Sequence, residues 1–178
     1  MRDLVARLAA ARIGGTYNQY AHSPLRCARL ADYLEARRDA PILLVGEAAG
    51  YRGARISGLP FTSERQLTGR GPAEATATIV HRVLEELGLD EQVLLWNVVP
   101  THPGTATSNR RPTRAEVADA LPFLETLLSG RRVVAVGRLA ADVTRSDYVR
   151  HPSHGGGNGF RAGLRALTGP GRPARVGL

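Results

Sequence analysis

The stretch LLVGEAAGYRGARISGLPFTSE, residues 43–64, decides how the rest of the sequence is interpreted. Together with the two residues before it, it opens on a nearly continuous apolar run over 41–46, which is typical of a parallel strand covered on both faces. The run ends at Gly46, and Glu47 follows at once. A glycine-rich segment then leads to Phe61, so we expect an acid and an aromatic ring to lie near the end of a buried strand.

Three other segments are predicted strands, and helical patterns lie between them. The strands are QVLLWN, RRVVAVG and DYVRH, at residues 92–97, 131–137 and 147–151. Helices are predicted at about 2–12, 24–38, 72–88, 113–130, 138–144 and 158–167, and Pro122 is expected to kink or divide the one that contains it. This order predicts one three-layer α/β domain over 1–167 with a mainly parallel sheet, followed by a loose tail over 168–178.

Polar side chains stand at the ends of three of these predicted strands. Glu47 follows the first strand, Asn97 ends the second and His151 ends the fourth. Open α/β sheets bind ligands beyond the carboxyl ends of their strands. Because parallel strands end at the same edge of a sheet, we expect an acid, an amide and an imidazole to share one rim of the domain.

The composition indicates a globular protein with a polyanionic partner. Of the 178 residues, 43% are hydrophobic and 22% are charged. The 24 basic residues, all arginine, outnumber the 16 acidic ones and give a net charge of +8, which favours nucleic acid as a partner, although an ordinary enzyme with a basic surface is the alternative. The N-terminus lacks the apolar centre of a secretory signal, and no run is long enough to span a bilayer, so we expect a cytoplasmic protein.

Neither a metal nor a cofactor is expected. The single cysteine, Cys27, excludes an internal disulfide and a four-cysteine metal site. His151 and His154 could pair on a metal with His22, His81 or His102, but the histidines are scattered along the chain. Nucleotide-binding glycine motifs are absent from the sequence, and HGGG at 154–157 has no G-x-S-x-G partner motif, so an esterase is set aside.

Three segments taken together resemble the uracil-DNA glycosylase superfamily. They are VGEAAGYRGARISGLPF, WNVVPTHPG with SNRRPT after it, and RHPSHGG, and the resemblance covers roughly residues 41–163. It implies a four-stranded parallel sheet in the order 2-1-3-4 and, with one cysteine, a branch without an iron–sulfur cluster. It also implies a monofunctional, monomeric DNA repair enzyme that hydrolyses the bond between uracil and deoxyribose and leaves an abasic site. Other deaminated bases are further candidate substrates.

The same resemblance assigns roles to individual residues. Asn97 is expected to read the N3 and O4 side of uracil, and His151 to donate a hydrogen bond to O2. Phe61 is expected to stack on the flipped base, and the backbone at Ala48 to position it. Glu47 is expected to orient the attacking water or to stabilise the cationic sugar.

Alternatives to these roles remain open at this stage. Glu64, in PFTSE, competes with Glu47 for the catalytic role, and we rank Glu47 first. Either carboxylate could instead cap a helix or pair with an arginine. Asn97 could simply close a turn, His151 could bond to backbone, and Phe61 could be a core residue.

Two further segments are predicted to contact the DNA backbone. NRRPTR places arginines at a helix start, where the helix dipole also favours phosphate. SHGGGNG presents bare backbone N–H groups. The residues expected to contact DNA are Arg110, Arg111, Ser153, His154, Gly155 and Gly156.

One departure from the family weakens a prediction about specificity. Gly50 stands where one branch of the family uses a tyrosine to exclude the methyl group of thymine. The sequence therefore does not support discrimination against thymine by that tyrosine. Two other functions therefore stay in view. One is an N-glycosidase acting on a free nucleoside, a nucleotide or another damaged base, and the other is a protein that binds DNA or a base without catalysis.

Overall fold

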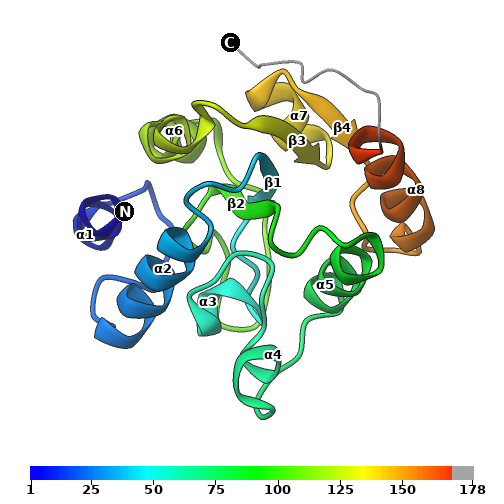
Figure 1. The fold of residues 1–178 in the computed structure, drawn as a ribbon. Coiled ribbons are helices and arrows are strands. Elements are labelled where there is room, and N and C mark those ends of the chain that lie inside the picture. The colour runs from blue at the N-terminus through cyan, green and yellow to red at the C-terminus, as the bar shows by residue number, and fades with distance from the viewer. Residues whose placement is uncertain (170–178) are drawn as a thin grey trace.

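A computed structural model describes residues 1–169 of the protein (Figure 1). The helices are α1 (Arg2–Ala10), α2 (Pro24–Ala36), α3 (Ala54–Ser57), α4 (Glu64–Thr68), α5 (Ala75–Leu87), α6 (Arg114–Leu128), α7 (Arg138–Thr144) and α8 (Gly157–Thr168). The strands are β1 (Ile42–Ala48), β2 (Val93–Val99), β3 (Arg132–Val136) and β4 (Asp147–Val149). The tail expected over 168–178 lies outside the described residues, except for Thr168, which ends α8, and Gly169.

The four strands form one parallel sheet in the order β2-β1-β3-β4, which confirms the predicted topology. Gly46 of β1 pairs with Asn97 of β2, and Ala48 pairs with Val99. Both strands therefore run two residues beyond their predicted ends, so that Asn97 lies inside its strand. By contrast β4 ends at Val149, and the histidine predicted to end it lies in the following loop.

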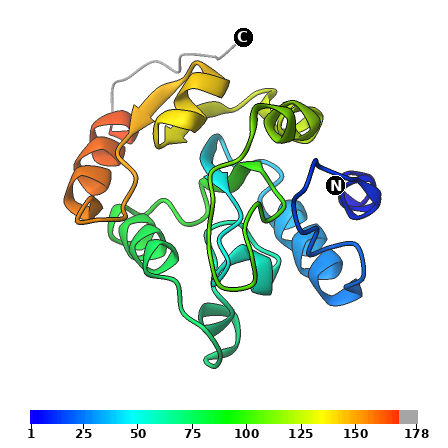
Figure 2. The ribbon, with the colours of Figure 1, turned by 180° about the vertical axis from the view of Figure 1, so that it is seen from behind.

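The sheet is covered on both faces, so the three-layer architecture is confirmed. Figures 1 and 2 show α1, α2 and α6 on one side of the sheet and α5 and α8 on the other. The sheet separates two hydrophobic cores, the first beneath α1, α2 and α6 and the second beneath α5 and α8. Side chains of β2 alternate between them, since Trp96 is buried in the first core and Leu95 in the second. The first core also takes Leu30 of α2 and Leu124 of α6, while Phe160 of α8 belongs to the second.

Helix α6 begins as the sequence predicted but is not divided. Thr113 accepts a hydrogen bond from the backbone N–H of Glu116, and the Glu116 carboxylate accepts one from the Thr113 N–H, which is a capping box. The helix continues unbroken through Pro122. Pro122 lies on the exposed face of the helix, where water can bond to the carbonyl that the missing N–H leaves free.

Two short helices in the glycine-rich segment escaped prediction. Both α3 and α4 are too short for a hydrophobic period to be visible in the sequence. Helix α4 does carry a capping box formed by Ser63 and Gln66, which was the one available signal. In addition, α5 starts at Ala75, three residues later than expected.

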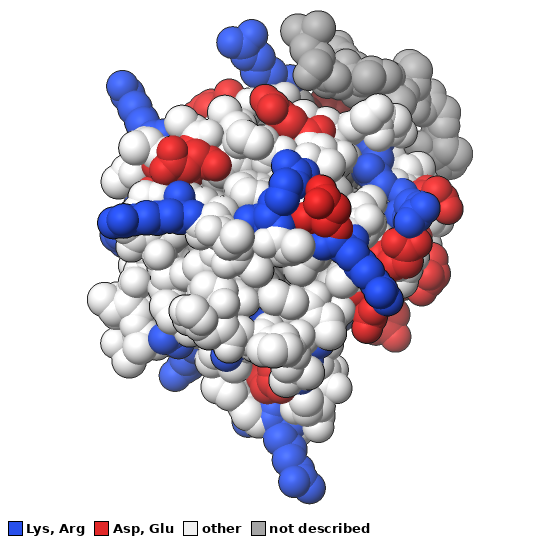
Figure 3. Space-filling model, turned by 90° about the vertical axis from the view of Figure 1, so that its left-hand side faces the viewer, with Lys and Arg blue, Asp and Glu red and all other residues white. Residues whose placement is uncertain are grey.

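The side of the molecule that carries α1 and α2 has mixed charge (Figure 3). Acidic side chains lie among the arginines there, and several arginines are paired, as in Arg38 with Glu35 and Arg7 with Asp3. This side is therefore not a uniformly basic surface for a polyanion. No helix within residues 1–169 is both long and apolar enough to cross a membrane.

Candidate active site

A pocket of about 460 Å³ opens at the carboxyl ends of the central strands. Glu47, Asn97 and His151, which the sequence placed on one rim, all line it. Most of the other predicted site residues line the same pocket, namely Ala48, Phe61, Arg110, Arg111, Ser153 and His154. Glu64, Gly155 and Gly156 are not in its lining.

Asn97 presents its amide to the pocket from a buried position. The residue is 4% exposed, and Oδ1 lies beside Gly46, where an added Cβ would approach it to 2.7 Å. The described part of the chain gives this amide no hydrogen-bond partner, although buried polar groups are normally paired. The amide is therefore free to donate and to accept within the pocket.

Phe61 is held on the pocket wall by an unusual backbone conformation. Its φ is +50°, a left-handed value that costs a non-glycine residue energy. The turn is braced because the Ser57 hydroxyl donates to the Thr62 carbonyl at 2.6 Å. The ring packs against Gly46, where any Cβ would collide with it, and it also belongs to the second core. Phe61 thus both packs in the core and borders the pocket.

The local contacts of His151 fix the position of its proton. The backbone N–H of Ser153 donates to Nδ1 at 3.2 Å, so Nδ1 accepts and the neutral ring carries its proton on Nε2. The Ser153 hydroxyl lies 2.8 Å from the same nitrogen. Burial lowers the pKa of His151, and the nearby His154 lowers it further. At neutral pH the site therefore offers an uncharged N–H donor.

Glu47 occupies the end of β1 with only a distant cation. The Arg111 guanidinium lies 4.0 Å from its carboxylate, and both side chains are partly exposed. Burial raises the pKa of Glu47, and the charge of Arg111 opposes that rise. The result is a carboxylate that is available to a ligand or a water and that takes up a proton more readily than an exposed glutamate.

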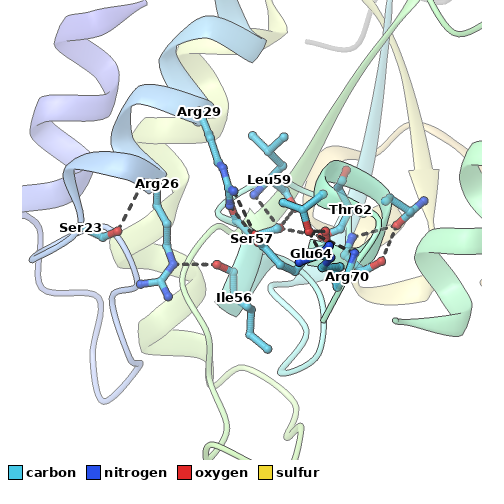
Figure 4. Close-up of polar contacts among 12 residues, drawn as sticks. Ser23, Arg26, Arg29, Ile56, Ser57, Leu59, Thr62, Glu64 and Arg70 are labelled. Carbon is cyan, nitrogen blue, oxygen red and sulfur yellow. Dashed lines mark hydrogen bonds and ion pairs between the residues drawn. The ribbon is translucent and has the colours of Figure 1, made fainter. Parts of the chain in front are cut away.

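Glu64, the competing acid, is engaged elsewhere (Figure 4). Its two carboxylate oxygens accept hydrogen bonds of 2.8 and 3.0 Å from the guanidinium of Arg29 on α2. The same guanidinium also donates to the Ser57 carbonyl at 3.2 Å. Glu64 therefore ties α2 to the start of α4, and it lies outside the pocket lining.

Arg110 and Arg111 are adjacent but differ in their partners. Arg110 forms a bidentate ion pair with Glu116, with N–O distances of 2.5 and 2.8 Å. These hydrogen bonds, together with those from Thr113, lower the pKa of Glu116 to about 2. Arg111 has only the long contact to Glu47 and is largely exposed. Of the two arginines, Arg111 has the freer guanidinium for a phosphate.

Glu116→Gln is expected to destabilise the protein by about 2 kcal/mol at pH 7, because a buried carboxylate with charged hydrogen bonds is lost. The folded pKa is depressed, so this stabilisation is fully present above the unfolded pKa of about 4.3 and disappears as the pH falls towards 2. Urea unfolding at a series of pH values measures the difference. Glu35→Gln, at the exposed pair with Arg38, is the control and should change stability little. An undiminished difference near pH 2 would contradict the assignment.

The loop after Pro152 makes a tight turn before α8. His154 and Gly155 both have positive φ, and the N–H of Gly156 donates to the Ser153 carbonyl at 3.0 Å. A Cβ at Gly156 would collide with the carbonyl of His151. Glycine is therefore needed here to let the histidine loop fold back on itself.

Three polar residues of the pocket lining were missed in the sequence: Glu74, Thr76 and Asn109. Glu74 and Thr76 flank the start of α5, and in α/β folds such helix starts face the carboxyl edge of the sheet, which was the available signal. Asn109 accepts a hydrogen bond from the Tyr51 N–H at 2.9 Å and so holds the loop after β1.

His102 and His81, which had been considered as metal ligands, have structural partners. His102 is fully buried, and its ring nitrogens lie 2.7 Å from the carbonyls of Ala49 and Thr105. His81 lies 3.1 Å from the Thr62 hydroxyl. Among residues 1–169 no group of three or more His, Cys, Asp or Glu side chains is arranged to hold a metal ion.

The fold and the pocket define a class: α/β proteins with a 2-1-3-4 parallel sheet and a ligand site at the carboxyl ends of the strands. The family model of the Uracil DNA glycosylase superfamily matches residues 33–168. The chain therefore belongs to this superfamily of DNA glycosylases, as its motifs predicted.

The same fold occurs in a solved structure. The crystal structure of wild-type SMUG2 from Pedobacter heparinus matches with a TM-score of 0.68 and 14% sequence identity, over 93% of this chain and 97% of that one. Nothing matches in a comparison with curated proteins.

Proposed function

We propose that the protein is a monofunctional uracil-DNA glycosylase, which hydrolyses the N-glycosidic bond of uracil in DNA and leaves an abasic site. The observation that carries this proposal is the meeting of Glu47, Asn97 and His151 at one pocket. These three groups supply an acid, an edge-reading amide and a neutral N–H donor. The superfamily supports glycosylase chemistry, and the pocket residues support uracil as the base.

Asn97 and Phe61 would recognise the extruded base. The amide of Asn97 can donate to O4 of uracil and accept from N3–H, and it has no partner among the described residues that would compete. The ring of Phe61 would cover one face of the base. Extrusion of a nucleotide costs a few kcal/mol, which these contacts help to offset.

His151 would stabilise the departing base. Cleavage of the glycosidic bond leaves negative charge on the uracil, part of it on O2. The neutral ring donates from Nε2, because Nδ1 accepts from the Ser153 N–H. A donor fixed in a partly buried site needs little reorganisation when the charge develops, which is why such groups matter most in catalysis.

Glu47 would act on the sugar side of the bond. In its ionised form it can accept a proton from the attacking water or stabilise the positive charge that develops on deoxyribose. Arg111 and the loop over 153–156 would hold the phosphates beside the extruded nucleotide. The products are free uracil and an intact strand with an abasic site.

The function is tested with an oligonucleotide that carries a single uracil. Wild-type protein should release the base and make the strand sensitive to alkali. Equal hydrolysis of a mononucleoside, insensitive to salt, would point instead to a nucleoside N-glycosidase. Salt-dependent retention of the oligonucleotide without base release would point to a non-catalytic binder. Either outcome would refute the proposal.

Asn97→Ala is expected to lower the single-turnover rate of uracil release about 10²-fold, because the donor to O4 is lost. The substitution also leaves a small void in β2, so each preparation is first checked by thermal unfolding. Asn18→Ala is the matched control, because the Asn18 amide donates to the backbone carbonyls of Leu8 and Ala11 at the end of α1 and does not line the pocket. A folded Asn97→Ala protein with the wild-type rate would remove Asn97 from the site.

A further inference from the structure

Glu74 lines the pocket, and its side chain occupies space that is left open because two neighbouring residues are glycines. It is the residue before α5, and its carboxylate lies against the backbone of Gly50 and Gly53. A Cβ at either glycine would collide with the carboxylate oxygens. The loop after β1 therefore has no side chain at the two points where it meets this acid.

The carboxyl group of Glu74 has no hydrogen-bond or ion-pair partner among residues 1–169. In the same region Glu64 and Glu116 are each held by two hydrogen bonds from an arginine. Residues 1–169 include 22 arginines, yet none of these is paired with this acid. Burial raises the pKa of Glu74, so its neutral form, which both donates and accepts, becomes more accessible. A partnerless carboxyl group on a pocket wall is available to a ligand.

Glu74 and His151 line the pocket from different parts of the sheet edge. The loop after β1, which contacts Glu74, lies beside β2. There the Ala49 N–H donates a hydrogen bond of 3.3 Å to the Val99 carbonyl. His151 follows β4 and lies against Gly137 at the end of β3. Along the order of the sheet, the loop that contacts Glu74 therefore lies toward the β2 edge, and His151 lies toward the β4 edge.

We propose that Glu74 is a specificity-determining residue that hydrogen-bonds to the C4–C5 edge of the bound base. This inference rests on the proposed function, in which His151 faces O2, because C5 lies opposite C2 in a pyrimidine ring. A polar group at C5 would find a hydrogen-bond partner in the carboxyl group. A methyl group would cover the carboxyl group and exclude water without offering a hydrogen bond in return, which penalises thymine.

The test compares two bases that differ in one small group. Oligonucleotides carry 5-hydroxyuracil or thymine, whose C5 hydroxyl and methyl groups are close in size, with uracil as the reference. The ratio of excision rates, 5-hydroxyuracil over thymine, is measured for wild type, Glu74→Gln and Glu74→Leu. We expect Glu74→Leu to lower this ratio by ~10-fold or more, and Glu74→Gln to lower it less, because an amide still donates and accepts. An unchanged ratio in a folded Glu74→Leu protein would overturn the proposal.

Gly53→Ala provides a second route to the same answer. Gly53 is not in the pocket lining, and a Cβ there would displace the Glu74 carboxyl group while adding nothing to the pocket. The ratio should fall in the same direction, and adding Glu74→Leu should lower it no further. If wild type releases no base, the proposed function fails. If wild type releases uracil but neither variant alters the ratio, only the role of Glu74 fails.

Discussion

Glu47→Gln is expected to lower the single-turnover rate of uracil release by roughly 10²–10⁴, the largest effect of any single change in the pocket. The amide keeps the shape of the side chain but cannot take a proton from water or balance a cationic sugar. Glu47 sits at the end of β1 with a cation no nearer than 4.0 Å, so its charge is not already neutralised by a close pair. Rapid-quench measurement on an oligonucleotide with one uracil gives this rate directly.

The pH dependence of the wild-type rate provides an independent readout for Glu47. Burial raises the pKa of this carboxyl group, and only the ionised form is active in the proposed mechanism. The rate should therefore fall as the pH drops through the raised pKa, earlier than an exposed glutamate would allow. In Glu47→Gln this part of the acid limb should disappear.

Glu64→Gln is the matched control, because it makes the same chemical change in the other candidate acid. It removes the ion pair with Arg29, so the protein should lose stability while keeping a rate close to that of wild type. If Glu64→Gln abolished the reaction while Glu47→Gln left it intact, the roles of the two acids would have to be exchanged.

His151→Ala is expected to lower the rate by roughly 10²–10³, because the fixed donor to O2 is lost where negative charge develops. His151→Gln, which keeps an N–H donor, should lose less. The pKa of His151 lies below its usual value, so the neutral ring predominates at pH 7. Above pH 7 the wild-type rate should therefore not change with pH until another group titrates. The same single-turnover assay, repeated across pH, measures both effects.

His154→Ala is the control for this second prediction. His154 also lines the pocket, but it is exposed, and its Nδ1 lies 3.1 Å from the Ser153 hydroxyl. Removing His154 should raise the pKa of His151 slightly, because the electrostatic interaction with His154 that lowers this pKa is lost. The pH profile of the reaction should then move to slightly higher pH. A larger loss in His154→Ala than in His151→Ala would mean that the imidazole roles had been assigned to the wrong residue.

The sequence predicted the features that depend on local pattern. Continuous apolar runs located β1, β2 and β3, and the order of elements together with the family motifs predicted the sheet order. Glu47, Asn97 and His151 were assigned to one edge of the sheet from the predicted strand ends alone. The errors of two residues in the ends of β1 and β2 did not change that assignment. In a parallel sheet all strands end toward the same edge, so side chains near those ends lie at that edge even when a predicted boundary is wrong by two residues.

Side-chain pairing was the part that the sequence could not predict. Glu64 remained a competitor of Glu47, although Glu47 ranked first, until the structure placed Arg29, 35 residues away along the chain, beside Glu64. Glu74 went unnoticed because its surroundings are made by two glycines that come more than twenty residues earlier. Such contacts depend on how loops pack, and the local periodicity of a sequence carries no information about that.

The buried ring of His102 has a consequence for how the enzyme would meet its substrate. It joins the backbone at Ala49, just after β1, to the segment that leads into Arg110 and Arg111, so these two walls of the pocket are held together in the folded protein. The conformational entropy of arranging those walls is then lost when the protein folds rather than when a nucleotide enters. A cavity already shaped before encounter would let the enzyme sample many intact bases quickly, since each rejection requires no rearrangement of the protein.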